Sequence, residues 1–255
     1  MNAVRTVFHI HTDYSDDGAN SPERIVRLAR ERGVGCVAVT DHDTLDGARA
    51  TAQAAGGDPA VIIGEEISTT GGHLIGLFLE AHVPAGLSPR DTALAIRRQG
   101  GLVVVPHPFN SMFSCGLRRH LAGITDLIDA VEVHNAQNLS PLPNRRAAAL
   151  AARLGRPALV GADIHHGDDL DVCYQMLAPF DGPREFLESL RTASLARGRH
   201  TPAYFVRTAW YVLGSRTGLW RPAGFGTNCP RRGPRILPDW SPPSAGPAAG
   251  NARRA

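Results

Sequence analysis

Residues 4–42 read VRTVFHIHTDYSDDGANSPERIVRLARERGVGCVAVTDH, and this stretch decides the fold. Its two ends, VRTVFHI and CVAVTDH, contain consecutive apolar residues, which is typical of strands that are covered on both faces. Between these ends, residues 21–33 begin with Ser and Pro, carry Glu23 in the first turn and reach Gly33, so they predict a helix. The stretch therefore predicts a strand, a helix and a second strand in a parallel sheet.

The same alternation continues along the chain. Apolar runs rich in β-branched residues recur at residues 60–68, 73–79, 102–108, 130–136 and 157–165. Helical patterns occupy residues 88–101, 144–155 and 182–198. Alternating strands and helices predict an α/β fold, either a closed barrel or an open doubly wound sheet.

The composition is that of one globular domain. The chain has 255 residues, of which 43% are hydrophobic, enough to enclose a single core. No run of 18 apolar residues occurs, and the first residues lack a basic segment followed by an apolar one, so we predict no membrane span, no signal peptide and a cytoplasmic location. The cysteines show no close pairing, which predicts free thiols in a reducing compartment: Cys36, Cys115, Cys173 and Cys229.

The charge is divided unevenly. Residues 206–255 hold eight of the 27 basic residues and one acid, Asp239, so their net charge is +7 and that of residues 1–205 is −4. Residues 206–255 are also dense in Pro and Gly, which predicts an irregular or disordered tail after a domain formed by residues 1–205. The aromatic segment 203–214 is predicted as a last strand or a docking segment. The chain contains no lysine, which excludes lysine-dependent mechanisms.

Potential metal ligands and acids gather at the ends of the predicted strands. These residues are His9, His11, Asp41, His42, Glu65, Glu66, His107, Glu132, His134, Asp163 and His165, and His73 opens the fourth run. The carboxyl ends of parallel strands meet at one crevice, so we expect these side chains to become neighbours. A single buried histidine is more often a hydrogen-bonded core residue, but the repetition favours a metal centre. Three histidines lie off the pattern and are predicted on the surface or in packing: His82, His120 and His200.

Imidazole and carboxylate ligands suit Mn, Zn or Fe. We therefore predict two or three divalent metal ions, with Glu66 as the carboxylate able to bridge two of them. Such ions acidify a bound water, clamp a substrate oxygen and neutralise a leaving phosphate oxygen.

Six motifs, taken in order, resemble those of the PHP (polymerase and histidinol phosphatase) family of metal-dependent phosphoesterases. They are FHIHTDYSDDG (8–18), AVTDHDT (38–44), IIGEEIS (62–68), GHLIGLF (72–78), VVPHP (104–108) and GADIH (161–165). The resemblance spans about residues 5–200. It implies a distorted (β/α)7 barrel with the metal site at the C-terminal ends of the strands.

The resemblance also implies a ligand set. One cation would be held by His9, His11, Glu66 and Asp163, and a second by Glu66, His73 and His107. The third would be held by His42, His165 and an acid of the first loop. Counting forward from the His11-Thr12 pair by the shorter spacing of the family selects Asp16, and counting back from Gly18 and the start of the helix selects Asp17, which we favour.

Catalytic roles fall to Asp41, His42, Glu66 and His165 by the same resemblance, with Asp41 orienting a ligand or moving a proton. Glu132 is expected to hold a metal-binding histidine from behind. Arg118 and Arg119 could grip a phosphate, and His134 could touch it, although a solvated surface position suits all three equally.

The expected function is hydrolysis of a phosphate ester by a metal-activated hydroxide. The favoured substrate is a nucleotide or short oligonucleotide, acted on by a phosphatase or a 5′-3′ exonuclease. Three alternatives stay open: a histidinol-phosphate type of small-molecule phosphatase, a nucleic-acid-binding protein that uses the basic tail, and a metal-binding regulatory module without turnover. The metal identity, the natural substrate and the oligomeric state are not determined by the sequence.

Overall fold

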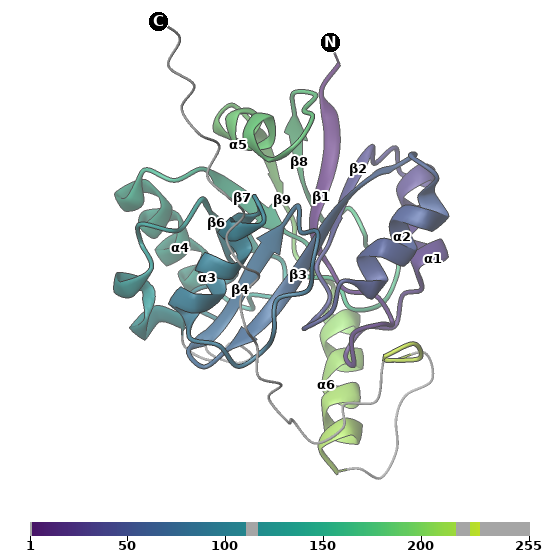
Figure 1. Cartoon of the computed structure of the whole chain (residues 1–255). Helices are drawn as coiled ribbons and strands as arrows, with labels where there is room; N and C mark the ends of the chain where they lie inside the picture. The colour runs from purple at the N-terminus through teal and green to yellow at the C-terminus, as the bar shows by residue number, and fades with distance from the viewer. Residues whose placement is uncertain (1, 111–116, 218–224, 230–255) are drawn as a thin grey trace, which may run out of the picture.

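The protein is a nearly closed barrel of strands with helices outside it, as seen in a computed structural model (Figure 1) that describes residues 2–110, 117–217 and 225–229. The strands are β1 (Val4–Ile10), β2 (Cys36–Val39), β3 (Ala60–Thr69), β4 (Gly72–Leu77), β5 (Leu102–Val105), β6 (Ala130–Asn135), β7 (Ala158–Gly161), β8 (Cys173–Leu177) and β9 (Ser194–Arg197). The helices are α1 (Pro22–Glu31), α2 (Asp46–Ala55), α3 (Pro89–Arg98), α4 (Pro141–Leu154), α5 (Pro183–Arg191) and α6 (Pro202–Thr217), with short 3-10 turns η1 (Leu117–Arg119) and η2 (Leu121–Gly123).

Helices α1 and α3 begin where the sequence predicts, whereas α4 begins at Pro141, before the predicted start at Asn144, and α2 lies in a stretch without a predicted helix. The Ser21 side chain accepts a hydrogen bond from the backbone N–H of Arg24 at 3.3 Å and so caps α1, and Ser88 caps α3 in the same way. Gly33 follows α1 with φ +63°, and Gly155 ends α4 with φ +61°. This left-handed conformation favours glycine, which explains why each helix stops there.

The sheet order is β7-β6-β5-β4-β3-β2-β1-β8-β9. β1, β2 and β3 are parallel, and so are β5, β6 and β7. β4 runs antiparallel to both of its neighbours, so it joins the two parallel halves without a helix between β3 and β4. In this hairpin Ser68 pairs with His73, so the first residues of β4 lie at the same edge as the C-terminal end of β3.

The barrel closes at the end that carries the histidine motif. Residues just after β7 pair with the end of β1: the backbone N–H of Ala162 donates to the Phe8 carbonyl at 2.9 Å, and that of His11 donates to the Ile164 carbonyl at 2.9 Å. An isolated parallel bridge joins Ile10 to Ile164. The distorted α/β barrel is therefore confirmed, and the open sheet is not formed.

The structure differs from three predictions for the C-terminal third. The predicted helix 182–198 contains α5 but ends at Arg191, and Ser194–Arg197 forms β9, which pairs antiparallel with β8. The predicted boundary at residue 205 falls inside α6, so residues 206–217 are helical and not irregular. Segment 203–214 is therefore part of a helix and not a strand. Most of the predicted tail, residues 230–255, lies outside the described residues.

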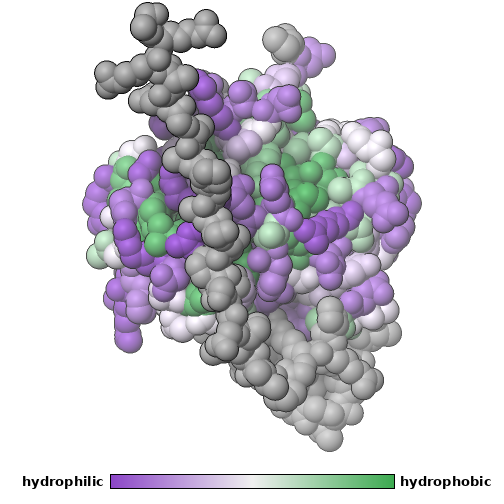
Figure 2. Space-filling model, viewed as in Figure 1, coloured by the Kyte–Doolittle hydropathy of each residue, from purple (hydrophilic) through white to green (hydrophobic). Residues whose placement is uncertain are grey.

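Apolar side chains fill the barrel and the space between the sheet and the helices. Leu77, Val104 and Phe186 are at most 1% exposed and belong to one cluster that joins β4, β5 and α5. On the face shown in Figure 2, the helices at both sides are largely hydrophilic, and hydrophobic side chains show between them. Among the described residues, no helix combines the length and apolarity needed to cross a membrane.

Replacing a core residue should destabilise the barrel. Leu77 is fully buried, so Leu77→Ala leaves a cavity and is expected to lower the free energy of unfolding by about 2–5 kcal/mol in urea titrations. Leu142→Ala is the matched control, because Leu142 is 51% exposed and should change that free energy by less than about 0.5 kcal/mol. Equal effects of the two substitutions would contradict the assigned core.

Candidate metal centre

The side chains predicted as ligands meet at one end of the barrel. They come from the ends of β1, β2, β3, β5 and β7, from the start of β4 and from the loop after β1. His9 and His11 are fully buried, and their rings lie 5.1 Å apart, so they share a face as expected. The register of β1 is irregular between Val7 and Ile10, where His9 has φ +67°, so the local backbone is not regular strand.

Glu66 lies at the centre of this cluster and is 1% exposed. Its Oε2 lies 3.0 Å from Nε2 of His9 and 3.3 Å from Nε2 of His11. Its Oε1 lies 2.9 Å from Nδ1 of His73 and 3.1 Å from Nε2 of His107. The two carboxylate oxygens therefore face two separate pairs of imidazoles, which is the arrangement that a bridging carboxylate requires.

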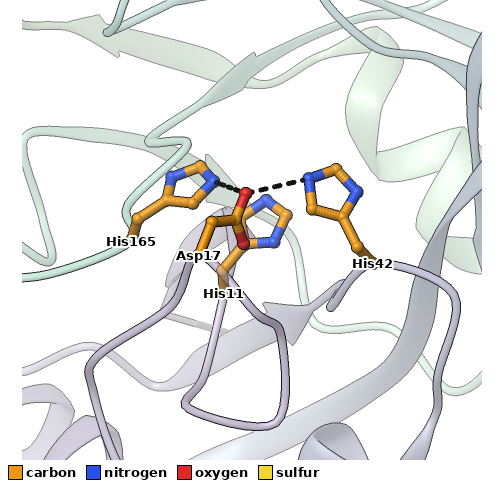
Figure 3. Close-up of side chains that lie close together, drawn as sticks. All are labelled: His11, Asp17, His42 and His165. Carbon is orange, nitrogen blue, oxygen red and sulfur yellow. Dashed lines mark ion pairs between the residues drawn. The ribbon is translucent and has the colours of Figure 1, made fainter. Parts of the chain in front are cut away.

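A second group forms around Asp17 (Figure 3). Oδ2 of Asp17 lies 3.3 Å from Nε2 of His42 and 3.2 Å from Nε2 of His165, and the His11 ring stacks on that of His165 at 4.1 Å. The Ser15 hydroxyl donates to the other Asp17 oxygen at 2.6 Å. The carboxylate that faces the histidines is therefore that of Asp17. Asp16 lines the cavity, but its carboxylate joins none of the ligand groups formed by the described residues.

Asp163 approaches the first group from β7. Its Oδ1 lies 3.5 Å from Nε2 of His9 and 3.7 Å from Nε2 of His11. The ligand atoms of His9, His107 and Asp163 all lie within 4.8 Å of one another. The ligand groups formed at one rim by the described residues therefore contain His9, His11, Asp17, His42, Glu66, His73, His107, Asp163 and His165.

Comparison with known proteins identifies the family. The sequence profile described as PHP domain matches residues 8–105. An uncharacterized protein of Methanocaldococcus jannaschii is 38% identical over 153 residues, which cover 55% of this chain and 87% of that protein. The chain belongs to the PHP domain family. The predicted family, and with it the predicted phosphoesterase class of enzyme, are confirmed.

A further relative and a solved structure each match most of the length of this PHP domain. The 5′-3′ exoribonuclease Rnm of Salmonella typhimurium is 27% identical, with 87% of this chain and 92% of that protein aligned. The crystal structure of PsfC from Pseudomonas syringae is 18% identical with a TM-score of 0.61, and the match covers 86% of this chain and all of that chain. The likeness to PsfC shows a shared fold.

Glu132 supports the ligands of this PHP domain from behind. Nδ1 of His9 donates to its Oε1 at 2.8 Å, and the other oxygen accepts from the backbone N–H of His107 at 2.6 Å and from the Asn135 amide at 3.0 Å. A Cβ on Gly161 would lie 1.6 Å from Oε1 of Glu132, so only glycine leaves room for this carboxylate. The expected role of Glu132 agrees with these contacts.

Asp41 acts on the first loop. It is fully buried and accepts hydrogen bonds from the backbone N–H of Thr12 at 2.6 Å and from the Thr12 hydroxyl at 2.7 Å. Burial outweighs these bonds and raises the pKa of Asp41 to about 7. Asp41 therefore fixes the start of the loop that carries Asp17, so it positions a ligand indirectly.

The carboxylates keep their charge despite burial. Burial by itself raises the pKa of Glu66 and of Asp17, but the nearby imidazoles, foremost His42 and His165 respectively, lower each pKa well below its usual range. Burial acts in the opposite direction on His9 and lowers its pKa. The carboxylates around His9, foremost Asp163, outweigh burial and raise that pKa. The site is therefore a set of ionised carboxylates whose charge is compensated by protonated imidazoles.

His11 differs from its neighbours. Burial and the charge of His165 lower the pKa of His11 to about 3, so its imidazole is neutral and has a free lone pair for a metal. Both ring nitrogens are buried and make no hydrogen bond of normal geometry with the described residues. Neutral imidazole beside ionised carboxylates is a donor set that fits Mn, Zn or Fe.

Three of the candidate ligands have left-handed backbone conformations. His9, His107 and Asp163 have φ values of +67°, +23° and +48°. Each such conformation costs a non-glycine residue about 1–3 kcal/mol and persists where the surrounding structure imposes it. The cost is concentrated at the ligand cluster, as is typical of functional sites.

Some residues predicted to bind substrate lie away from the cluster. Arg118 and Arg119 are exposed on η1 and are not among the residues that line the cavity at the cluster. His134 points elsewhere, because its Nε2 donates to the Gly198 carbonyl at 2.7 Å and its Nδ1 accepts from the Asn144 amide. The structure therefore does not bring these three side chains into the site.

Several residues that hold the ligands in place lie outside the predicted set. Asn135 donates to Asp163 at 2.8 Å, and Gln137 donates to the Asp163 carbonyl at 2.7 Å and lies 3.0 Å from Nδ1 of His165. The Tyr204 hydroxyl accepts from the backbone N–H of His165 and donates to the Asp163 carbonyl. Polar residues at the end of β6 and just after it were a signal for Asn135 and Gln137, but no local pattern indicates Tyr204.

Removing the charge of Glu132 should weaken metal binding. Glu132→Gln would place an amide N–H₂ or a neutral oxygen against donors on His9, His107 and Asn135. We therefore expect metal affinity to fall by about 10- to 100-fold. Isothermal titration calorimetry with Mn²⁺ measures this affinity. Glu188→Gln is the control, because Glu188 lies exposed on α5, and equal affinities for the two variants would refute the supporting role.

Metal binding should tighten as the pH rises. The pKa of His42 and His165 is raised above 6.5 because Asp17 outweighs burial, so below these pKa values a proton competes with the cation for each imidazole. We expect Mn²⁺ affinity to increase from about pH 6 to about pH 8, with protons released on binding. Calorimetric titrations in buffers of different ionisation enthalpy measure the Mn²⁺ affinity and the number of protons released. A pH-independent affinity without proton release would contradict the assignment of His42 and His165 as ligands.

Proposed function

We propose that this PHP domain hydrolyses phosphate ester bonds with divalent cations held in the cluster, and that its substrate is a nucleotide or short oligonucleotide. The observation that carries the proposal is the position of Glu66, whose two oxygens face two different pairs of imidazoles. A carboxylate placed in this way suits two neighbouring cations, and such pairs are typical of phosphoesterase chemistry.

The proposed ligand groups follow from the distances. His9, His11, Glu66 and Asp163 would hold one cation, Glu66, His73 and His107 a second, and Asp17, His42 and His165 a third. Bound cations supply the positive charge that activates water and stabilises the phosphoryl group.

The cavity needs that positive charge. Asp17, Glu66 and Asp163 line it, and their lowered pKa values keep them ionised. Bound cations would replace the imidazole protons that otherwise compensate these carboxylates, and they would then face an anionic substrate. Gln137 and Tyr204 hold the loop of His165 and Asp163 in place and so keep the ligand groups in position.

The cavity also has room for more than a phosphate. Its volume is about 310 Å³, and beyond the ligands it is lined by polar and aromatic side chains: Ser68, Asn110, Gln137, His166, Thr208, Tyr211 and Phe225. Cavities of this size hold small organic ligands. The alignment with the 5′-3′ exoribonuclease Rnm covers 92% of that protein, and this likeness supports a nucleotide phosphate over histidinol phosphate as the substrate.

A substrate panel tests the proposal. The Mn²⁺-loaded chain is offered 5′-phosphorylated short RNAs, nucleoside 3′,5′-bisphosphates and histidinol phosphate, and released nucleotide or phosphate is measured. We expect the highest kcat/KM for a nucleotide-containing ester. A preference for histidinol phosphate would contradict the proposed nucleotide substrate and favour a small-molecule phosphatase. No turnover of any ester would favour a regulatory metal-binding module.

Loss of one ligand should abolish turnover without unfolding the chain. His42→Ala removes an imidazole that faces both Asp17 and Glu66, so we expect kcat/KM to fall by about 10³-fold or more with little change in the urea midpoint. His120→Ala is the matched control, because His120 is exposed beside η1. A fully active His42→Ala variant would contradict the metal centre.

A further inference from the structure

Helix α6 and residues 225–229 lie against the mouth of the barrel, next to the loop that carries Asp17 (Figure 1). Tyr211 and Phe225 from these two segments line the cavity together with the ligands. Their rings stack on each other at 4.3 Å with an angle of 15° between planes, so the two segments form one unit.

This unit holds the two carbonyls that flank Asp17. The Tyr211 hydroxyl donates to the Asp16 carbonyl, and the backbone N–H of Gly226 donates to the Gly18 carbonyl at 2.8 Å. Asp17 is thus the one residue between two backbone anchors. Its side chain is the carboxylate that faces His42 and His165 (Figure 3).

Asn228 adds a third connection to the same loop. Its backbone N–H donates to the Asp13 carbonyl at 3.0 Å, and its side-chain amide donates to the Asp13 carboxylate at 3.1 Å. The neighbouring residue Thr12 is held from the barrel by Asp41. The loop is therefore anchored from the barrel on one side and from the C-terminal segment on the other.

The same helix also holds the second ligand of this group. Tyr204 of α6 bonds the backbone of His165 and Asp163, and the Thr208 hydroxyl of α6 lies 3.0 Å from Nε2 of His166. The ring of His166 packs edge-on against Phe225 at 5.6 Å. One element therefore contacts both loops that supply Asp17 and His165.

We infer that α6 and residues 225–229 form a positioning element for the cation site of Asp17, His42 and His165, with Tyr211 and Gly226 as positioning residues. The inference rests on the proposed metal centre. It makes the C-terminal segment part of the catalytic domain, because a cation that binds Asp17 requires the loop to be ordered beforehand. The cations held through Glu66 have ligands on the barrel strands, and the bonds of Tyr211 and Gly226 do not reach those ligands.

Two substitutions test the inference in the full-length chain. Tyr211→Phe removes only the hydroxyl that holds Asp16, and the matched control Tyr174→Phe makes the same change on β8, where Tyr174 packs against Arg5. Gly226→Ala would place a Cβ 3.2 Å from the Asp16 backbone at φ +57°, and its control Gly123→Ala meets no atom within 4 Å.

Binding of Mn²⁺ alone, followed by the electron paramagnetic resonance signal of the unbound ion, is the main readout. We expect Tyr211→Phe to raise the Kd of one bound Mn²⁺ by about 3- to 10-fold and Gly226→Ala by more than about 10-fold, while the other ions and both controls keep their affinities. Turnover of Tyr211→Phe should recover when Mn²⁺ is raised, because the defect is in cation affinity.

Three outcomes would overturn the inference. Superimposable Mn²⁺ titrations for Tyr211→Phe, Gly226→Ala and the native chain would show that the element does not act on the site. Equal weakening of every bound ion, without rescue by Mn²⁺, would show a general structural role. A native chain that binds no Mn²⁺ would contradict the proposed metal centre and this inference with it. A native chain that binds Mn²⁺ as tightly as the two variants do would contradict the inference alone.

Discussion

The structure depends on the compensation of one buried negative charge, that of Glu66. An ionised carboxylate with 1% exposure is stable only when opposite charges or cations surround it. The imidazoles that do so come from the ends of β1 and β5 and from the start of β4, so their contact requires the barrel to close. The pairing of residues 162–164 with the end of β1 makes that closure. Fold and site are therefore consequences of the same geometry.

The site extends beyond the barrel strands. Glu132 orients His9 from behind, Asp41 fixes Thr12 at the start of the first loop, and Tyr204 bonds the backbone of His165. These residues touch ligands or the loops that carry them, and each is buried. The left-handed backbone at His9 shows that the supporting packing imposes the ligand geometry at a local cost. A metal centre of this kind is a property of the whole domain.

Much of the fold could be predicted because its signals are local. Consecutive apolar residues predicted β1 and β2, and Ser-Pro starts followed by Gly predicted α1 and α3 correctly. The antiparallel direction of β4 was not predictable from its apolar run, because direction depends on which neighbour a strand pairs with and not on its own composition. The helix at residues 206–217 was missed because Pro and Gly in the residues after it dominated the composition of the whole tail.

The sequence by itself determined the chemical type of the site: histidines and acids at strand ends, in an order that resembles the PHP family, with Glu66 as the bridging candidate. Tertiary structure alone decided that Asp17 faces the histidines while Asp16 contributes its carbonyl, and that Arg118, Arg119 and His134 lie outside the cavity lining. It also decided that α6 packs against the first loop. Residue types and spacings are encoded locally, whereas the direction of a loop carboxylate depends on contacts with residues about 200 positions away, such as Tyr211, and these exist only in the folded chain.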